Sequence, residues 1–195
     1  MRIACLHTTS RSIAVYEAAV PCGVALAHHL RSDLLYRART GAGTALAAET
    51  NVQLARMANG VDAVLATGST LADAVAPPAF SATALLAEAA AEEAGDRSVD
   101  VLYTHDLAAP AIRRLFQGRI PADQLTFTAI PDAWAALHAG DSERHDCLVR
   151  RAVAESTAER LVLVQATMAD CAPDDPRIIR TPRAALSRLT RLLGA

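Results

Sequence analysis

The sequence predicts an α/β protein with mostly parallel sheets flanked by helices. Three observations predict it: short apolar runs alternate with longer helical stretches, glycines follow several of those stretches, and a strand-and-turn segment is repeated. Buried parallel strands give continuous apolar runs, whereas helices show a period of 3.6 residues. Alternation of the two at this spacing is typical of a parallel sheet.

Four apolar runs are predicted to be buried strands. They are RIACLHT at 2–8, VDAVLATG at 61–68, VDVLYTH at 99–105 and RLVLVQA at 160–166. A further strand is predicted at LLYRART, residues 34–40, and its later counterpart at LTFTAIP, residues 125–131. Val, Ile, Leu and Thr are frequent in these runs, and such residues suit a half-buried or fully buried strand.

Six stretches between these runs are predicted to be helices: 12–30, 47–59, 81–95, 109–118, 143–157 and 182–194. Gly60, Gly95 and Gly118 fall where three of them should stop. Asp141 or Ser142 is expected to cap the charged helix that follows. The alanine-rich AEAAAEEAG is predicted to be a strong helix former, not a functional acidic patch.

Composition excludes several classes of partner. The chain has 195 residues, of which 52% are hydrophobic, so it is long and apolar enough to bury a core. A net charge of -2 without a basic block, and 4% aromatic residues, argue against nucleic acid or a membrane surface as partner. No apolar run is long enough to span a membrane, and a strand-like segment follows Met1 directly. We expect a cytoplasmic protein.

The cysteines and histidines lack the spacing of metal sites. Cys5, Cys22, Cys147 and Cys171 form no CxxC pair, and the six histidines form neither HxH nor HExxH. Free buried thiols are therefore predicted, together with the absence of a structural metal. Nothing in the sequence indicates a cofactor.

Two segments of the chain read alike. DAVLATGSTLAD at 62–73 matches ERLVLVQATMAD at 159–170, with Gly68 on Gln165 and Thr70 on Thr167. At nearly the same offset CLHTTS falls on VLYTHD, which places Thr8 on Thr104. The repeat predicts a duplicated α/β unit.

The turns after the four strands are rich in small hydroxyl residues. Parallel sheets bind ligands beyond the carboxyl ends of their strands, where N–H and O–H donors converge on an anion. Two similar halves would bring these turns around one cleft and form a carboxylate site. Each hydroxyl has an alternative role as a helix N-cap. The turns are His7-Thr8-Thr9-Ser10, Gly68-Ser69-Thr70, Tyr103-Thr104-His105-Asp106 and Gln165-Ala166-Thr167.

With these motifs the chain resembles the aspartate/glutamate racemase superfamily, which includes hydantoin racemases, maleate isomerases and arylmalonate decarboxylases. IACLHTTS, VDAVLATGSTLADAV, VDVLYTHD, LHAGDSERHDCLVRRAV and LVLVQATMADCAP carry the resemblance over nearly the whole chain. It implies two pseudo-twofold α/β lobes, residues 1–96 plus 179–195 and residues 97–178, with the active site between them. It also implies a cofactor-independent isomerase or lyase acting on a small carboxylic acid, with a homodimer as the candidate quaternary state.

The chain differs from the racemases that it resembles at both positions of the catalytic cysteines. Cofactor-independent racemases of this kind use one cysteine per lobe, and Gly68 and Gln165 stand at those positions. Neither residue exchanges protons near neutral pH. Arylmalonate decarboxylases resemble this chain in having glycine at the first position, followed by hydroxyl residues that bind carboxylate, but they keep the second cysteine.

The candidate site follows from these comparisons. His7, Tyr103 and Gln165 are the candidate catalytic residues, and His7 is preferred because it ends the first strand and histidine titrates near neutral pH. His105 and Asp106 are further titratable candidates, whereas His145 and Cys171 are left outside the site. The candidate substrate-binding residues are Thr8, Ser10, Gly68, Ser69, Thr70, Thr104, Ala166 and Thr167.

Two functions are compatible with the sequence. The first is an enzyme that stabilises an enediolate-like state without the thiol pair. The second is a catalytically lapsed protein that binds a carboxylate or a partner protein.

Overall fold

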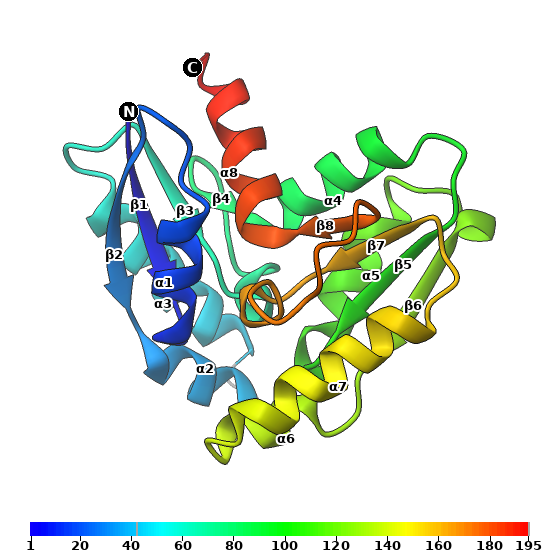
Figure 1. Cartoon of the computed structure of the whole chain (residues 1–195). Coiled ribbons are helices and arrows are strands. Elements are labelled where there is room, and N and C mark those ends of the chain that lie inside the picture. The colour runs from blue at the N-terminus through cyan, green and yellow to red at the C-terminus, as the bar shows by residue number, and fades with distance from the viewer. Residues whose placement is uncertain (42, 195) are drawn as a thin grey trace.

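The computed structural model describes residues 1–41 and 43–194 and contains two four-stranded parallel sheets (Figure 1). The first sheet has the order β2-β1-β3-β4, with β1 Arg2–His7, β2 Ala25–Leu30, β3 Ala63–Ala66 and β4 Phe80–Ser81. The second has the order β6-β5-β7-β8, with β5 Val99–Tyr103, β6 Leu125–Ala129, β7 Arg160–Leu163 and β8 Ile178–Arg180. All the pairings are parallel, so the predicted α/β fold is confirmed.

Helices flank both sheets. The first sheet carries α1 Arg11–Ala18, α2 Ser32–Arg39 and α3 Gly43–Met57, and the second carries α5 Ala109–Gln117, α6 Ala133–His138 and α7 Ser142–Glu155. Two further helices follow the edge strands, α4 Ala82–Ala94 after β4 and α8 Thr181–Leu192 after β8. Short 3-10 turns follow β3, β5 and β7, with one more before β6: η1 Ser69–Leu71, η2 Asp106–Ala108, η4 Ala166–Met168 and η3 Ala122–Gln124.

The repeat seen in the sequence is present in the structure. Strands β3 and β7 begin 97 residues apart, at Ala63 and Arg160. The turns η1 and η4 are separated by the same 97 residues, from Ser69 to Ala166. The two sheets have matching strand order and parallel pairing, which is consistent with the predicted duplication of an α/β unit.

Helices α4 and α8 tie the lobes together. After β4 of the first sheet, α4 contributes Leu86 and Ala90 to the core that contains Val101 of the second sheet. After β8 of the second sheet, α8 contributes Leu186 and Leu189 to the first-lobe core. Full burial of a leucine side chain contributes about 1.5–3 kcal/mol. The two helices lie side by side between the sheets (Figure 1), and the exchange holds the lobes as one body.

The predicted strand at residues 34–40 is wrong, because Ser32–Arg39 form helix α2. Leu34 and Leu35 are buried, and Ala38 packs against the same core as Leu34 at helical spacing. Asp33 in the first turn and arginines in the last complement the helix dipole. The apolar and basic residues therefore follow a helical period, not a strand period.

The predicted helix at residues 12–30 is also wrong in its second half. Helix α1 ends at Ala18, and Ala25–Leu30 form the edge strand β2. Pro21 and Gly23 separate them in a turn closed by the bond from the Val24 N–H to the Pro21 carbonyl, 3.2 Å, with Gly23 at φ 78°. Proline lacks the N–H that a helix interior requires, and glycine adopts positive φ without strain.

The other predicted elements are present within a few residues. Asp141 is the cap of α7, since its side chain accepts from the Arg144 N–H, and Gly95 ends α4 at φ 57°. The short elements β4, β8 and α6 were not predicted from the sequence. No helix in the described part of the chain combines the length and the apolar character needed to cross a membrane.

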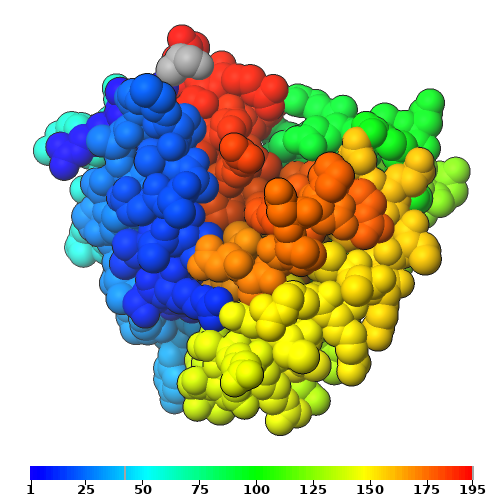
Figure 2. Space-filling view, viewed as in Figure 1, coloured from blue at the N-terminus to red at the C-terminus, as the bar shows by residue number. Residues whose placement is uncertain are grey.

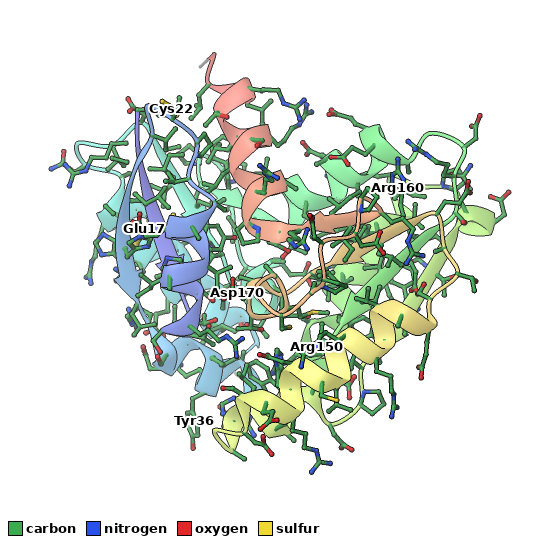
Figure 3. All side chains as sticks on the ribbon, viewed as in Figure 1. Glu17, Cys22, Tyr36, Arg150, Arg160 and Asp170 are labelled. Atoms are coloured by element: carbon green, nitrogen blue, oxygen red, sulfur yellow. The ribbon has the colours of Figure 1, made fainter. Side chains whose placement is uncertain are left out.

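The cysteines are free thiols, as predicted, but only two of them are buried. Cys5 and Cys171 lie in the cores of the first and second lobes, whereas Cys22 and Cys147 are exposed. The expectation of four buried thiols is therefore wrong for the two exposed ones. Cys22 lies in the turn between α1 and β2, which the continuous helix prediction had placed inside a helix (Figure 3).

Candidate functional site

The turns after β1, β3, β5 and β7 meet between the lobes around a small cavity of about 30 Å³. Its wall is rich in hydroxyl groups and comes from both lobes: Thr8, Thr9, Ser12, Leu35, Thr67, Gly68, Ser69, Thr70, His105, Trp134, Gln165, Ala166 and Thr167. A volume of this size holds about one water molecule. In the view of Figure 2 the two lobes meet along the middle of the molecule, consistent with a closed cleft.

Gln165 spans the cavity. Its Oε1 accepts from the Thr104 backbone N–H at 3.0 Å, and its Nε2 donates to Ser69 Oγ at 3.2 Å. Gln165 and Ser69 are both buried. The amide of Gln165 therefore links the second lobe to the first at the point where the resemblance assigns a thiol.

Gly68 is confined by Thr8. A Cβ atom added to Gly68 would lie 2.8 Å from Thr8 Oγ1 and 3.1 Å from Thr8 Cγ2. Carbon atoms do not approach other atoms this closely without displacement, and a β-branched threonine has few alternative rotamers. The side chain of Thr8 thus fills the space that any side chain at position 68 would need.

Three buried hydroxyl groups at the strand ends have no hydrogen-bond partner among the described residues: Thr70 Oγ1, Thr104 Oγ1 and Thr167 Oγ1. Thr70 and Thr167 line the cavity, one from each lobe, whereas Thr104 meets it only through its N–H bond to Gln165. Buried hydroxyl groups normally have a partner, because leaving one without costs about 1–3 kcal/mol. The hydroxyl groups of Thr70 and Thr167 are therefore unpaired donors at the cavity wall among the described residues.

His105 adds a ring donor to the same wall. Its Nδ1 accepts from the Leu107 N–H at 3.2 Å, so the neutral ring carries its proton on Nε2. Nε2 is buried without a partner among the described residues, and the ring packs against Trp134 at 4.3 Å between centroids. Burial, followed by the positive charges of Arg39 and His138, lowers the pKa of His105. His105 is therefore neutral near pH 7 and available as a hydrogen-bond donor.

His7, the preferred catalytic candidate, does not line the cavity. It is fully buried, its Nδ1 lies 2.9 Å from Thr67 Oγ1, and its Nε2 lies 2.8 Å from His28 Nδ1. Burial, with the neighbouring charges of His28 and His29, lowers its pKa to about 4. His7 alternates with Leu6 along β1, so its ring points to the face that carries Cys5 and Tyr16.

The remaining candidates divide between the cavity and other surroundings. Thr8, Gly68, Ser69, Thr70, Gln165, Ala166 and Thr167 line the cavity as expected. Tyr103 lies in the second-lobe core beside Val101, and Ser10 and Asp106 are exposed. These three residues end or follow strands, but their side chains do not line the cavity.

Four lining residues were missed by sequence reasoning: Ser12, Leu35, Thr67 and Trp134. Thr9 was named in its turn but not among the candidate binding residues. Trp134 is the only tryptophan of the chain and lies on α6, a helix that was not predicted. Leu35 lies on α2, which was mistaken for a strand. Thr67 ends the predicted strand 61–68 immediately before Gly68, so its place beside the turn was the available signal.

A second polar cluster joins the lobes beside the cavity. Asp146 Oδ1 accepts from Arg11 Nη2 at 3.2 Å and lies 2.8 Å from His145 Nδ1. Arg11 belongs to α1 of the first lobe and Asp146 to α7 of the second, so the ion pair crosses the lobe interface. Burial, together with Asp146, raises the pKa of Cys171 to about 12, which keeps this thiol protonated and unreactive.

Two groups of side chains bring metal-ligating atoms within 4.8 Å of one another, Cys5 with His7 and His28, and His145 with Asp146 and Cys171. His7 Nε2, His28 Nδ1 and His145 Nδ1 already take part in the hydrogen bonds described above, whereas His145 Nε2 is buried without a partner among the described residues. The absence of a metal site stays a prediction.

Larger depressions lie elsewhere on the molecule. One of about 670 Å³ runs along β6 and α7, and includes Thr126 and Arg144. It lies away from the cavity between the lobes, where the carboxyl ends of the central strands converge. In parallel sheets those ends, not the outer faces, are the usual place for ligands.

The fold and the cavity define a class: a two-lobed α/β protein with converging hydroxyl and amide donors at the strand ends of both lobes. Comparison with protein-family models and with curated proteins finds no match. Solved structures match over nearly the whole chain. The aspartate racemase of Picrophilus torridus has a TM-score of 0.74 at 10% identity, covering 99% of this chain and 94% of its own.

Two further structures agree. The glutamate racemase RacE1 of Bacillus anthracis has a TM-score of 0.68 at 10% identity, covering 98% of this chain and 80% of its own. The allantoin racemase of Klebsiella pneumoniae has a TM-score of 0.65 at 19% identity, covering 99% and 87%. At these identities the comparison establishes the fold. The chain has the fold of these racemases, a two-lobed α/β fold of the kind that the sequence predicted.

Proposed function

We propose that the protein binds a small carboxylic acid between its lobes and acts on it as an isomerase or lyase, through an enediolate-like state and without a thiol pair. The observation that carries the proposal is the convergence of the partnerless Thr70, Thr167 and His105 donors on one cavity between the lobes. Hydrogen bonds to a charged group contribute about 1.5–3 kcal/mol each. Donors placed in this way also stabilise the charge that develops on an enediolate.

The two lobes supply donors from opposite sides. Thr70 follows β3 in the first lobe, and Thr167 and His105 follow β7 and β5 in the second. A carboxylate has two oxygens and about four lone-pair sites, so it accepts from both sides at once. Three neutral donors, with no carboxylate side chain among the lining residues, suit an anion better than a cation.

Ligand entry requires movement. A cavity of about 30 Å³ is too small for a carboxylic acid, and Gln165 closes it by donating to Ser69. Parting of the lobes, or rotation of the Gln165 side chain, would expose the donors. We therefore assign the observed arrangement to the closed state of a hinged site.

The chemistry differs from two-thiol racemisation. A two-base racemase places an acid and a base on opposite faces of the α-carbon, and neither Gly68 nor Gln165 exchanges protons. His105 is the only histidine that lines the cavity within the described residues, and it lies on the second-lobe side. Decarboxylation and isomerisation need no opposed pair of thiols, so they fit this wall better than two-thiol inversion.

A second candidate function is carboxylate binding without turnover. The observation that favours it is the Gln165 amide itself, which is held by Thr104 and Ser69 in place of an acid-base group. Proton exchange and turnover separate the two candidates, because an enediolate takes up a proton from the site whether it forms by loss of an α-hydrogen or of carbon dioxide.

The test is incubation in D2O with amino acids, hydantoins, malonates and maleate, followed by proton NMR. The proposal expects deuterium incorporation or turnover of at least one compound, with loss in His105→Gln and in Thr70→Val. Thr126→Val, which removes an exposed hydroxyl on the outer depression, is the matched control and keeps the activity. Saturable binding with neither exchange nor turnover in the whole panel would support the second candidate and refute catalysis.

A further inference from the structure

A chain of side chains leads from the cavity wall to solvent through the first lobe. Thr67 lines the cavity, and its Oγ1 lies 2.9 Å from His7 Nδ1. His7 Nε2 lies 2.8 Å from His28 Nδ1, and His28 Nε2 lies 2.6 Å from Glu17 Oε1. His7 is fully buried, whereas the Glu17 side chain is 51% exposed. Glu17 lies on α1 of the first lobe (Figure 3).

The sheet register explains this path. Strands β1 and β2 are parallel, with Cys5 opposite His28 and His7 opposite Leu30. His7 and His28 are therefore diagonal neighbours on one face of the sheet, and rings of this length reach across that diagonal. Tyr16 of α1 packs edge-on against His7 at 5.4 Å between centroids and covers the pair from the helix side.

We propose that Thr67, His7, His28 and Glu17 form a proton relay that connects the cavity to solvent. The relay depends on the proposed function only at its cavity end, where a bound carboxylic acid would gain or lose the proton. Each of the three contacts is short enough for a hydrogen bond. No gap interrupts the path.

The relay has two complete arrangements. In the neutral one, Thr67 donates to His7 Nδ1, His7 donates from Nε2 to His28 Nδ1, and His28 donates from Nε2 to Glu17. In the charged one, His28 carries a proton on both nitrogens and donates to His7 and to Glu17. His7 then donates from Nδ1 to Thr67 Oγ1, and the Thr67 hydroxyl donates to the Leu6 carbonyl at 2.9 Å.

The two arrangements differ by one proton. Starting from the charged arrangement, the Thr67 O–H turns from the Leu6 carbonyl toward the cavity and gives its proton to the carbanionic carbon of an enediolate. Thr67 takes the His7 Nδ1 proton, and His7 Nε2 takes the His28 Nδ1 proton. One C–H bond forms, one unit of negative and one of positive charge disappear, and the relay is left neutral. The reverse sequence removes a proton from the acid, and the Glu17 end exchanges protons with water.

A proton fits between the two rings better than a metal ion. Two nitrogens bound to tetrahedral zinc at about 2.05 Å lie about 3.3 Å apart. The His7 to His28 distance of 2.8 Å is that of a hydrogen bond. The nearby thiol of Cys5 is held protonated, since burial and then Glu17 raise its pKa to about 12.

In this scheme the charge difference between the two arrangements lies on His28, because the other groups of the relay and its surroundings keep their charge. Burial raises the pKa of Tyr16 well above its usual value, so Tyr16 and Cys5 are both neutral over the whole range near pH 7. The lowered pKa of His7, about 4, keeps this ring neutral in both arrangements. Glu17 stabilises the charged arrangement, and His29, which is exposed on the same strand, opposes it.

The test is nitrogen-15 NMR of the histidine rings as a function of pH, with no ligand present. The relay predicts that His7 changes from the Nε2–H to the Nδ1–H tautomer at the same pH at which His28 gains its second proton. In Glu17→Gln both midpoints move together to lower pH. In Thr67→Val, which removes the acceptor for Nδ1–H, His7 keeps the Nε2–H tautomer. Its N–H then opposes a second proton on His28 Nδ1, so the midpoint of His28 moves to lower pH without a tautomer change at His7.

His29→Gln is the matched control, because it removes a neighbouring histidine outside the relay and leaves the coupled change in place. A wild-type His7 that keeps one tautomer throughout the His28 titration, or changes at a different pH, would overturn the relay. The NMR titration requires no substrate, so its failure is distinguishable from failure of the deuterium exchange experiment.

Discussion

Gln165 donates from Nε2 to Ser69 Oγ at 3.2 Å while its Oε1 accepts from the Thr104 N–H at 3.0 Å, so one side chain joins the two lobes. The Gln165 to Ser69 bond is buried where the turns η1 and η4 meet. It replaces the acid-base group expected at this position by a fixed structural contact. Under the proposed function, a ligand entering the cavity has to break this bond.

Removal of this bridge should destabilise the protein. Gln165→Met keeps the length of the side chain but leaves the Thr104 N–H without its acceptor, at a cost of about 1–3 kcal/mol. Ser69→Ala should cost less, because Gln165 still accepts from Thr104. Urea unfolding measures both free energies. A Gln165→Met variant as stable as the wild type would contradict the bridge.

Gly68 and Thr8 should be energetically coupled. Gly68→Ala places a Cβ 2.8 Å from Thr8 Oγ1, and overpacking of this kind typically costs about 1–3 kcal/mol. Thr8→Ala removes the two clashing atoms and leaves the Thr8 Cβ at an ordinary 3.6 Å. The double variant should therefore be more stable than the sum of the single effects predicts. Strict additivity in a double-mutant cycle would show that Thr8 does not confine position 68.

Stability should fall on acidification because of His7. Its pKa is lowered from 6.5 to about 4 in the folded state, so the unfolded chain binds a proton more readily. The contribution of neutral His7 to the free energy of unfolding is fully present above pH 6.5. It is lost as the pH falls toward 4, by up to about 3 kcal/mol. His7→Gln should flatten the dependence of unfolding free energy on pH in this window. An unchanged slope would show that another group is responsible.

Thiol reactivity should divide the four cysteines into two pairs. Cys22 and Cys147 are exposed, whereas Cys5 and Cys171 are buried with pKa values raised to about 12. Because the thiolate is the reactive form, an aromatic disulfide reagent should modify two thiols in the native protein and four after denaturation. Rapid modification of Cys171 in the native protein would indicate that the cluster with Asp146 opens easily.

Much of the fold was predictable from the sequence, because buried parallel strands have continuous apolar runs and the repeat fixes their pairing. The errors at residues 12–30 and 34–40 have one cause: β2 is a half-exposed edge strand, so its composition does not separate it from a helix. Pro21 and Gly23 were the local signal for the break. The edge strands β4 and β8 have two and three residues, too few for a period to be seen.

The candidate site was predictable at the level of the turns but not of every side chain. Thr70 and Thr167 were found because they occupy matched positions of the repeat. His7 was placed at the correct strand end, but the alternation of side chains along β1 points its ring away from the cavity. The contribution of Trp134 depends on α6, a helix of six residues that only tertiary packing specifies.

The central claim is that the cavity between the lobes binds a small carboxylate through donors from both lobes. Titration of the nitrogen-15 labelled protein with malonate and the other acids of the panel, followed by amide NMR, tests it most directly. The predicted result is saturable shifts for at least one acid, largest at Ser69, Thr70, His105 and Thr167, and weakened at least tenfold in affinity by Thr70→Val. No saturable shift with any acid, or shifts confined to the outer depression along β6 and α7, would contradict the claim.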